Sequence, residues 1–218
     1  MSILHTVKTK QTVRIAVGLA LAAGFLLVVG TLSTNGTFTD FDLAIRKWVV
    51  SVQSPLLTSI FLSATWLGST VQLFVLGTIV LLIFIWLRQW RLLGLFLLAM
   101  LGQITLHLGF KALFAIPRPE PLINNYAIDD SYSFPSGHAI AATSFFGFLA
   151  LVLLERFKGT GLRVSISFLA VAVIFLICFS RIYIGVHRPS DVLAGFVAGA
   201  IWLAALPLSS NNHVTTSE

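Results

Sequence analysis

The sequence has very little charge: Asp, Glu, Lys and Arg make up only 10% of its 218 residues, whereas soluble globular domains carry about 25%. Apolar residues make up 57% of the chain and the mean hydropathy is +0.94, which excludes a soluble protein. The only cysteine, Cys178, lies in an apolar run and cannot form an internal disulfide. The formal net charge is +6. In so apolar a chain, basic residues more often set membrane topology than bind nucleic acid, so we expect no nucleic-acid partner.

Long apolar runs bounded by charges make up most of the chain. A membrane-spanning helix needs about 20 mostly apolar residues. The longest uncharged stretch contains two natural breaks, Pro55 and the pair Gly68–Ser69, so a short interfacial helix over Pro55–Leu67 is predicted before the next span. The fold class is therefore all-α, a single membrane domain over residues 1–218 built from six transmembrane helices plus that interfacial helix. The predicted spans are Ile15–Val29, Thr70–Leu87, Leu92–Phe110, Ser131–Leu154, Val164–Ser180 and Val192–Leu206.

The basic residues orient this bundle in the membrane. The N-terminus, the Arg88–Arg91 turn, the Glu155–Arg163 loop and the C-terminal tail share one predicted face, with eight basic and two acidic side chains. The opposite face carries six of each. The positive-inside rule then places both termini in the cytoplasm and the opposite face outside it. The first apolar run is longer than the core of a signal peptide and ends at no clear cleavage site, so we interpret it as a retained signal-anchor helix.

Three polar clusters emerge on the predicted extracytoplasmic face, each at the end of a span. Charged groups at these positions are costly unless they are paired or functional, so their collection at one level predicts a site. The clusters are Lys111 with Arg118–Pro119, then Pro135–Ser136–Gly137–His138, and then Ser180–Arg181 with His187 and Asp191.

The residue types in these clusters suit phosphate chemistry. Lys111, Arg118 and Arg181 offer three cations, and the two guanidinium groups can grip phosphate oxygens with two hydrogen bonds each. Ser136 is a good helix N-cap, and the free backbone N–H groups of Gly137 and the residue after it would form an anion site at the helix N-terminus.

Two imidazoles, His138 and His187, can divide the roles of acid and nucleophile. Asp191 lies in the first turn of the last predicted span, where it can accept the ring N–H of His187 and fix its tautomer. Two histidines and one aspartate could also bind zinc, but the three neighbouring cations would repel the ion. We therefore expect neither a metal nor another cofactor.

Together the clusters resemble the three-part signature of the type 2 phosphatidic acid phosphatase superfamily. Eleven residues match it in order and spacing, as Lys111-x6-Arg118-Pro119, Pro135-Ser136-Gly137-His138 and Ser180-Arg181-x5-His187-x3-Asp191. The resemblance implies a metal-independent membrane phosphatase whose core covers about residues 107–206. It implies that His187 attacks phosphorus to form a phosphohistidine, supported by Asp191, while His138 protonates the leaving oxygen. The phosphoryl oxygens would be bound by Lys111, Arg118, Ser136, Gly137 and Arg181.

The expected function is hydrolysis of a membrane lipid phosphate or diphosphate at an extracytoplasmic site. Undecaprenyl diphosphate, phosphatidylglycerophosphate and phosphatidic acid all fit. The small size of the chain and the extracytoplasmic site suit a bacterial envelope enzyme, which favours the first. Two alternatives stay open: a protein that binds or translocates lipid phosphates without chemistry, and a phosphatase of water-soluble esters. The lipid bilayer and its lipid phosphates are the expected partners, and no obligate protein partner is expected.

Residues outside the three clusters have simpler interpretations. His107 is expected to pack or form a hydrogen bond one turn before the first cluster, and Arg188 to bind a headgroup or nothing. Gly195 and Gly199 form a small-xxx-small face that predicts close helix packing. The Pro55–Leu67 helix is a candidate wall or gate for lipid access to the site.

Overall fold

The protein is an all-helical bundle, which confirms the predicted fold class. The computed structural model describes residues 2–123, 126 and 132–208, and over these residues it contains eight α-helices and no strand. The helices are α1 (Ser2–Thr34), α2 (Thr39–Val52), α3 (Pro55–Leu67), α4 (Thr70–Trp86), α5 (Trp90–Phe114), α6 (Gly137–Arg156), α7 (Thr160–Ile184) and α8 (Pro189–Ala205).

Four of these helices are long and apolar enough to cross a membrane: Thr9–Thr34 within α1, and all of α5, α6 and α7. Helices α3 and α4 meet at a bend of 51° and count together as a fifth candidate, while α8 is apolar but has only 17 residues. The chain is therefore a multi-pass membrane protein, and the predicted count of six spans is not confirmed.

The start of α6 and the presence of α2 differ from the sequence-based prediction. The span expected from Ser131, itself outside the described residues, begins as a helix only at Gly137. Residues 132–136 are not helical, because a residue that precedes a proline, here Pro135, is biased away from the helical region. Helix α2 was not predicted at all, since its sequence carries four charges and offers no long apolar run.

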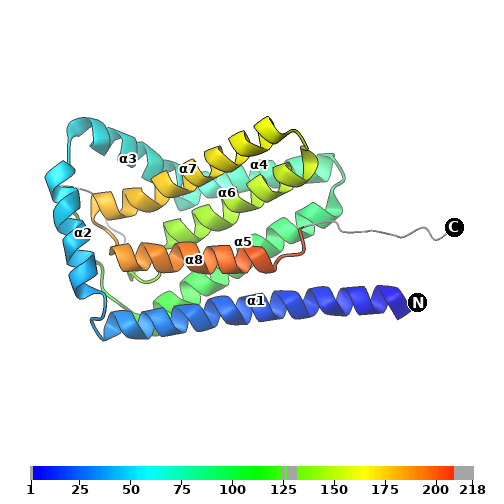
Figure 1. Ribbon diagram of the computed structural model, residues 1–218, viewed down its shortest axis with the longest axis horizontal. Coiled ribbons are helices and arrows are strands. Elements are labelled where there is room, and N and C mark those ends of the chain that lie inside the picture. The colour runs from blue at the N-terminus through cyan, green and yellow to red at the C-terminus, as the bar shows by residue number, and fades with distance from the viewer. Residues whose placement is uncertain (1, 124–125, 127–131, 209–218) are drawn as a thin grey trace.

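The arrangement of the helices brings four of their ends together. In Figure 1 the carboxyl ends of α5 and α7 and the amino ends of α6 and α8 all lie toward the same end of the bundle, and α2 runs across that end. This is the end to which all three sequence clusters belong.

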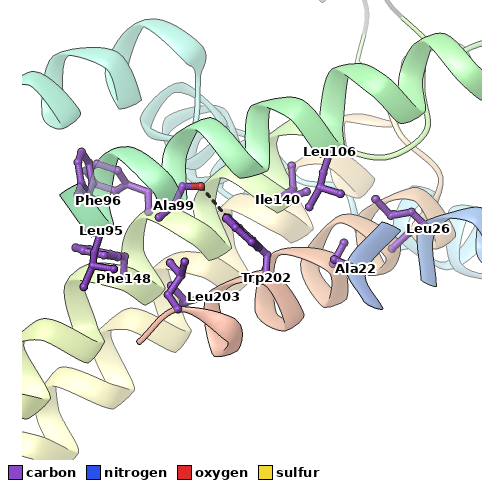
Figure 2. Close-up of a cluster of buried hydrophobic side chains, with 14 of the residues drawn as sticks. Ala22, Leu26, Leu95, Phe96, Ala99, Leu106, Ile140, Phe148, Trp202 and Leu203 are labelled. Carbon is purple, nitrogen blue, oxygen red and sulfur yellow. Dashed lines mark hydrogen bonds between the residues drawn. The ribbon is translucent and has the colours of Figure 1, made fainter. Parts of the chain in front are cut away.

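Helix α8 is packed into the middle of the bundle. Figure 2 shows Trp202 of α8 inserted among buried side chains, with its Nε1–H donating to the Ala99 carbonyl of α5 at 3.0 Å. A Cβ at Gly195 would lie 2.7 Å from the Ser136 carbonyl oxygen, and one at Gly199 would lie 3.1 Å from that of Ile140. Only glycine lets α6 and α8 come so close, and the predicted packing role of the two glycines is confirmed.

Candidate active site

The structure brings every predicted site residue to the end of the bundle that α2 crosses. They come from the last turn of α5, the segment after it, the start of α6, the last turn of α7, and the loop and first turn of α8. In chain order they are Lys111, Arg118, Ser136, Gly137, His138, Arg181, His187 and Asp191.

Two left-handed residues turn the chain at this end. Helix α5 ends at Ala115 with φ +48°, and α7 ends at Gly185 with φ +85°. The Leu122 N–H donates to the Ile184 carbonyl at 2.7 Å, so the segment after α5 is fastened to the end of α7. A Cβ at Gly185 would lie 2.7 Å from the Leu122 backbone nitrogen, so this position requires glycine both for its φ and for this close approach.

His187 receives a hydrogen bond from the first cluster. The Arg118 guanidinium lies 2.8 Å from His187 Nε2 and also donates to the Val186 carbonyl at 3.2 Å. Because a guanidinium only donates, Nε2 must accept through its lone pair, and the ring proton of the neutral imidazole sits on Nδ1. The nitrogen with the free lone pair, Nε2, is thus the one that faces Arg118, a predicted phosphate-binding cation.

The surroundings of His187 keep its ring neutral. Its side chain is buried, and burial together with the nearby cations Arg181, Arg118 and Lys111 lowers the pKa of His187 well below its ordinary value; a backbone hydrogen bond to Ser133 opposes this. All three cations of the sequence clusters therefore act on this imidazole. A neutral imidazole with an unprotonated Nε2 is the form that can act as a nucleophile.

Ser133 stands between His187 and Asp191, and sequence reasoning did not find it. The His187 Nδ1 to Asp191 Oδ2 distance is 3.9 Å, too long for a hydrogen bond. The Ser133 hydroxyl donates to Asp191 Oδ2 at 2.6 Å and lies 3.4 Å from His187 Nδ1, and the residue is fully buried. In the structure the carboxylate therefore does not accept the ring N–H directly, and the serine hydroxyl bridges the two side chains.

Asp191 is also fixed by the backbone at the start of α8. Its Oδ2 accepts the Arg188 N–H at 2.9 Å, and its carbonyl accepts the Ser136 N–H at 3.1 Å. The latter contact joins the second and third clusters directly. Asp191 Oδ1 is buried and has no hydrogen-bond partner within the residues that the structure describes.

The start of α6 has the features of an anion site. Ser136 occupies the N-cap position, but its side chain makes no cap hydrogen bond, and within the described ranges its buried Oγ has no partner. The expected N-cap position of Ser136 is confirmed, but its hydroxyl does not accept a helix N–H, which leaves a donor beside the first N–H groups of the helix. A Cβ at Gly137 would lie 2.6 Å from His107 Nε2, so the His107 ring packs on this glycine, as the packing interpretation predicted.

Helix α3 forms one wall of this end. The Arg181 guanidinium donates to Thr65 Oγ1 at 2.5 Å and to the Tyr126 hydroxyl at 3.1 Å. His138 is hydrogen-bonded to the backbone of Thr65 and interacts electrostatically with Arg181 and His187. The Lys111 ammonium donates to the Tyr132 carbonyl. The two imidazoles and three cations are thus held by four different helices and the loops between them.

No cluster of three or more His, Cys, Asp or Glu side chains that could hold a metal ion occurs in the described part of the chain.

The fold and this end of the bundle define the class first: an all-helical, multi-pass membrane protein with three cations gathered around two imidazoles. Within that class the chain belongs to the PAP2 superfamily, whose family model matches residues 92–214. This confirms the resemblance carried by the three sequence clusters.

Individual relatives agree with this assignment. The chain is 30% identical over 184 residues to phosphatidylglycerophosphatase B of Bacillus subtilis, covering 81% of this chain and 86% of the relative. It is 31% identical over 110 residues to an undecaprenyl-diphosphatase of Sulfolobus acidocaldarius, covering 49% and 46% of the two chains. The crystal structure of a transmembrane PAP2 type phosphatidylglycerolphosphate phosphatase from Bacillus subtilis superposes with a TM-score of 0.74 at 26% identity, covering 85% of this chain and 92% of that one.

Proposed function

We propose that the protein is a metal-independent membrane lipid phosphatase that works through a phosphohistidine on His187. The observation that carries this proposal is the hydrogen bond from Arg118 to His187 Nε2 at 2.8 Å. An anion that replaces this contact on the guanidinium would bring its phosphorus next to the unprotonated nitrogen. The remaining residues of the site then have separate tasks.

In the first step Nε2 attacks phosphorus, and the bond from phosphorus to the lipid oxygen breaks. His138 donates a proton to that oxygen, so the lipid leaves as an alcohol, or as a monophosphate if the substrate is a diphosphate. Asp191, acting through Ser133, stabilises the positive charge that develops on the His187 ring. In the second step His138 takes a proton from water, the water oxygen bonds to phosphorus, and the bond to Nε2 breaks to release inorganic phosphate.

The cations stabilise the charge that spreads over the phosphoryl oxygens. Lys111, Arg118 and Arg181 supply three positive charges, and the Ser136 hydroxyl and the N–H groups at Gly137 supply fixed donors. These groups lie together at one end of the bundle, so binding requires them to exchange hydrogen-bond partners and not to be assembled from distant positions. These groups and both histidines lie in a phosphatase core over about residues 107–206.

The substrate class follows from the membrane setting. We infer a lipid phosphate or diphosphate, with phosphatidylglycerophosphate and undecaprenyl diphosphate as the leading candidates, since relatives carry those names. Phosphatidic acid belongs in the same panel. Helix α3, which holds Arg181 and His138 through Thr65, is the proposed wall along which the lipid reaches the site.

The topology belongs to the same proposal: both termini in the cytoplasm, and the site outside it. The single cysteine allows a direct test, because Cys178 is buried among apolar side chains and can be replaced by alanine without burying a polar group. In that background Lys47→Cys on α2 should react with a membrane-impermeant thiol reagent in intact cells, and Lys158→Cys in the α6–α7 loop should react only after permeabilisation. The reverse pattern would invert the proposed orientation.

The activity is tested by phosphate release from the purified protein in mixed micelles, in excess chelator, over the lipid panel. We expect phosphate release that survives chelation and is lost in His187→Asn. When the wild-type protein is incubated with substrate carrying radioactive phosphate and the reaction is quenched, we expect the protein to retain a label that acid removes. Competition with a water-soluble phosphate ester separates a lipid enzyme from a soluble-ester enzyme. Lipid binding without any release would exclude hydrolysis and support a binding or translocating protein instead.

A further inference from the structure

A pocket of about 590 Å³ opens at the same end of the bundle and borders the proposed active site at His187. It lies between the end of α1, helix α2, the segment after α5 and the start of α8. Its volume is in the range of small-ligand sites, roughly 300–1,000 Å³. Of the proposed catalytic residues only His187 is among the described residues that line it, and none of the proposed phosphate-binding residues is.

The pocket is not on the side where the leaving group departs. In an in-line displacement the leaving oxygen lies opposite the attacking nitrogen, next to the acid His138. His138 contacts Thr65, and a Cβ at Gly68 would lie 3.3 Å from its ring, so that side is formed by α3. Among the described residues, no part of α3 lines the pocket. This step rests on the proposed function; the chemistry of the pocket itself does not.

The polar part of the pocket carries one net positive charge. Arg46 of α2 and Arg188 of the loop before α8 line it, and Asp42 is the one carboxylate among its described lining residues. Asp42 accepts the Ser190 N–H at 2.9 Å and the Ser190 hydroxyl at 2.7 Å. With Asp42 ionised, two guanidinium groups face one carboxylate. A ligand with a single negative charge would balance them.

Arg46 is held in place by the chain around it. Its guanidinium donates to the Glu120 carbonyl at 2.7 Å and to the Gly185 carbonyl at 3.4 Å. These bonds fix its plane, and three of the five N–H groups of the guanidinium are not used by them, so a ligand in the pocket that Arg46 lines can bind them. A preset fork of this kind suits phosphate oxygens better than a flexible ammonium group would.

The rest of the lining is largely apolar, with Phe38, Leu43, Phe114 and Ile182 among its members. Two candidate membrane spans, α1 and α5, end at this pocket, at Thr34 and Phe114. The pocket therefore lies where spans leave the hydrocarbon region, which is the depth of lipid headgroups. The net charge of the pocket, the planar shape of its guanidinium donors and its depth in the membrane all fit the headgroup of an anionic lipid.

We propose that this pocket is a second lipid site, which binds the headgroup of an anionic phospholipid whose phosphate is a diester. The phosphate sits on Arg188 and Arg46, and the glycerol end of the lipid lies against the apolar lining. Arg188 adjoins His187 in sequence, and its N–H holds Asp191 at 2.9 Å. A lipid bound to Arg188 therefore contacts the loop that carries the nucleophile, on the side away from His138 and from the proposed phosphate-binding residues.

The test measures lipid bound to the detergent-purified full chain by native mass spectrometry, with phosphatidylglycerol as the anionic probe and phosphatidylcholine as the zwitterionic one. We expect Arg188→Gln to weaken phosphatidylglycerol binding about tenfold, as the loss of a charge-assisted hydrogen bond would. Arg188→Lys keeps the charge but loses the planar guanidinium, so its affinity for phosphatidylglycerol should lie between those of the wild type and Arg188→Gln. If Arg188→Gln does not fold, Arg188→Lys is compared with the wild type instead. Lys47→Gln, which removes an exposed cation of α2 outside the pocket, is the matched control and should bind like the wild type.

Further arms separate this site from the others. Arg118→Gln should leave the binding unchanged, and added inorganic phosphate should not displace the lipid. Equal binding by Arg188→Gln and Lys47→Gln would overturn the proposal, as would loss of the lipid in Arg118→Gln, because the lipid would then sit in the catalytic centre. Displacement by inorganic phosphate would show a free-phosphate site and overturn the lipid assignment. None of these measurements requires turnover, so the failure of the proposed hydrolysis would be seen separately.

Discussion

Replacing Ser133 with alanine would remove the hydroxyl that joins His187 to Asp191. That hydroxyl donates to Asp191 Oδ2 at 2.6 Å, and hydrogen bonds to charged groups contribute about 1.5–3 kcal/mol. If this stabilisation reaches the transition state through the ring, kcat falls about tenfold to a hundredfold, at 1.36 kcal/mol for each factor of ten. Because Ser133 is fully buried and does not reach the substrate, KM should stay close to the wild-type value.

The assay is phosphate release under saturating and limiting lipid phosphate, which separates kcat from KM. Ser144→Ala is the matched control, since this serine of α6 is also fully buried but lies about two turns away from Gly137. The double variant Ser133→Ala/Asp191→Asn should lose no more activity than Asp191→Asn alone, because both changes break the same connection. A kcat within twofold of wild type in Ser133→Ala, with a large loss in Asp191→Asn, would refute the bridging role.

Three further predictions test other parts of the site. Arg118→Lys loses the fork that reaches both His187 Nε2 and the Val186 carbonyl, so kcat should fall at least about tenfold in the release assay, and an unchanged rate would show that charge alone suffices. Since the folded protein lowers the pKa of His187, Nε2 stays unprotonated as the pH falls, and the acid limb of kcat/KM against pH should lie well below 6.5; a limb at or above 6.5 would contradict the assignment. Gly185→Ala forces a φ of +85° on alanine and a clash with the Leu122 backbone, so thermal unfolding in detergent should show a loss of about 1–3 kcal/mol or more, and an unchanged midpoint would count against the tight fit.

The sequence predicted the cores of the long helices because apolar runs bounded by charges mark them. It predicted their ends less well. The span expected to stop at Ser180 continues as α7 to Ile184, and Arg181 lies inside it because its guanidinium donates to Thr65. A charged residue ends a span only when its side chain must reach water. A charged residue with a buried hydrogen-bond partner can stay inside the helix, and that partner belongs to another helix that the local sequence does not reveal.

The residues of the candidate site could be predicted where they belong to the three-part motif with fixed spacings, as His187 does. Ser133 belongs to no such spacing. Its position depends on the connection from α5 to α6, where its N–H donates to the Ile116 carbonyl at 2.7 Å. Helix α2 was missed for a related reason: its charged residues find partners in distant segments, as Arg46 does at Gly185 and Asp42 at Ser190.

The central place of α8 has a consequence for how the enzyme meets different membranes. Helices that face lipid tilt when the hydrocarbon thickness does not match their length. Helix α8 has eleven buried residues, and both Asp191 at its start and Trp202 near its end are held by neighbouring helices rather than by lipid. When the outer helices tilt, they would therefore move relative to α8 and its direct neighbours. The reaction centre would then keep its geometry in both thin and thick bilayers.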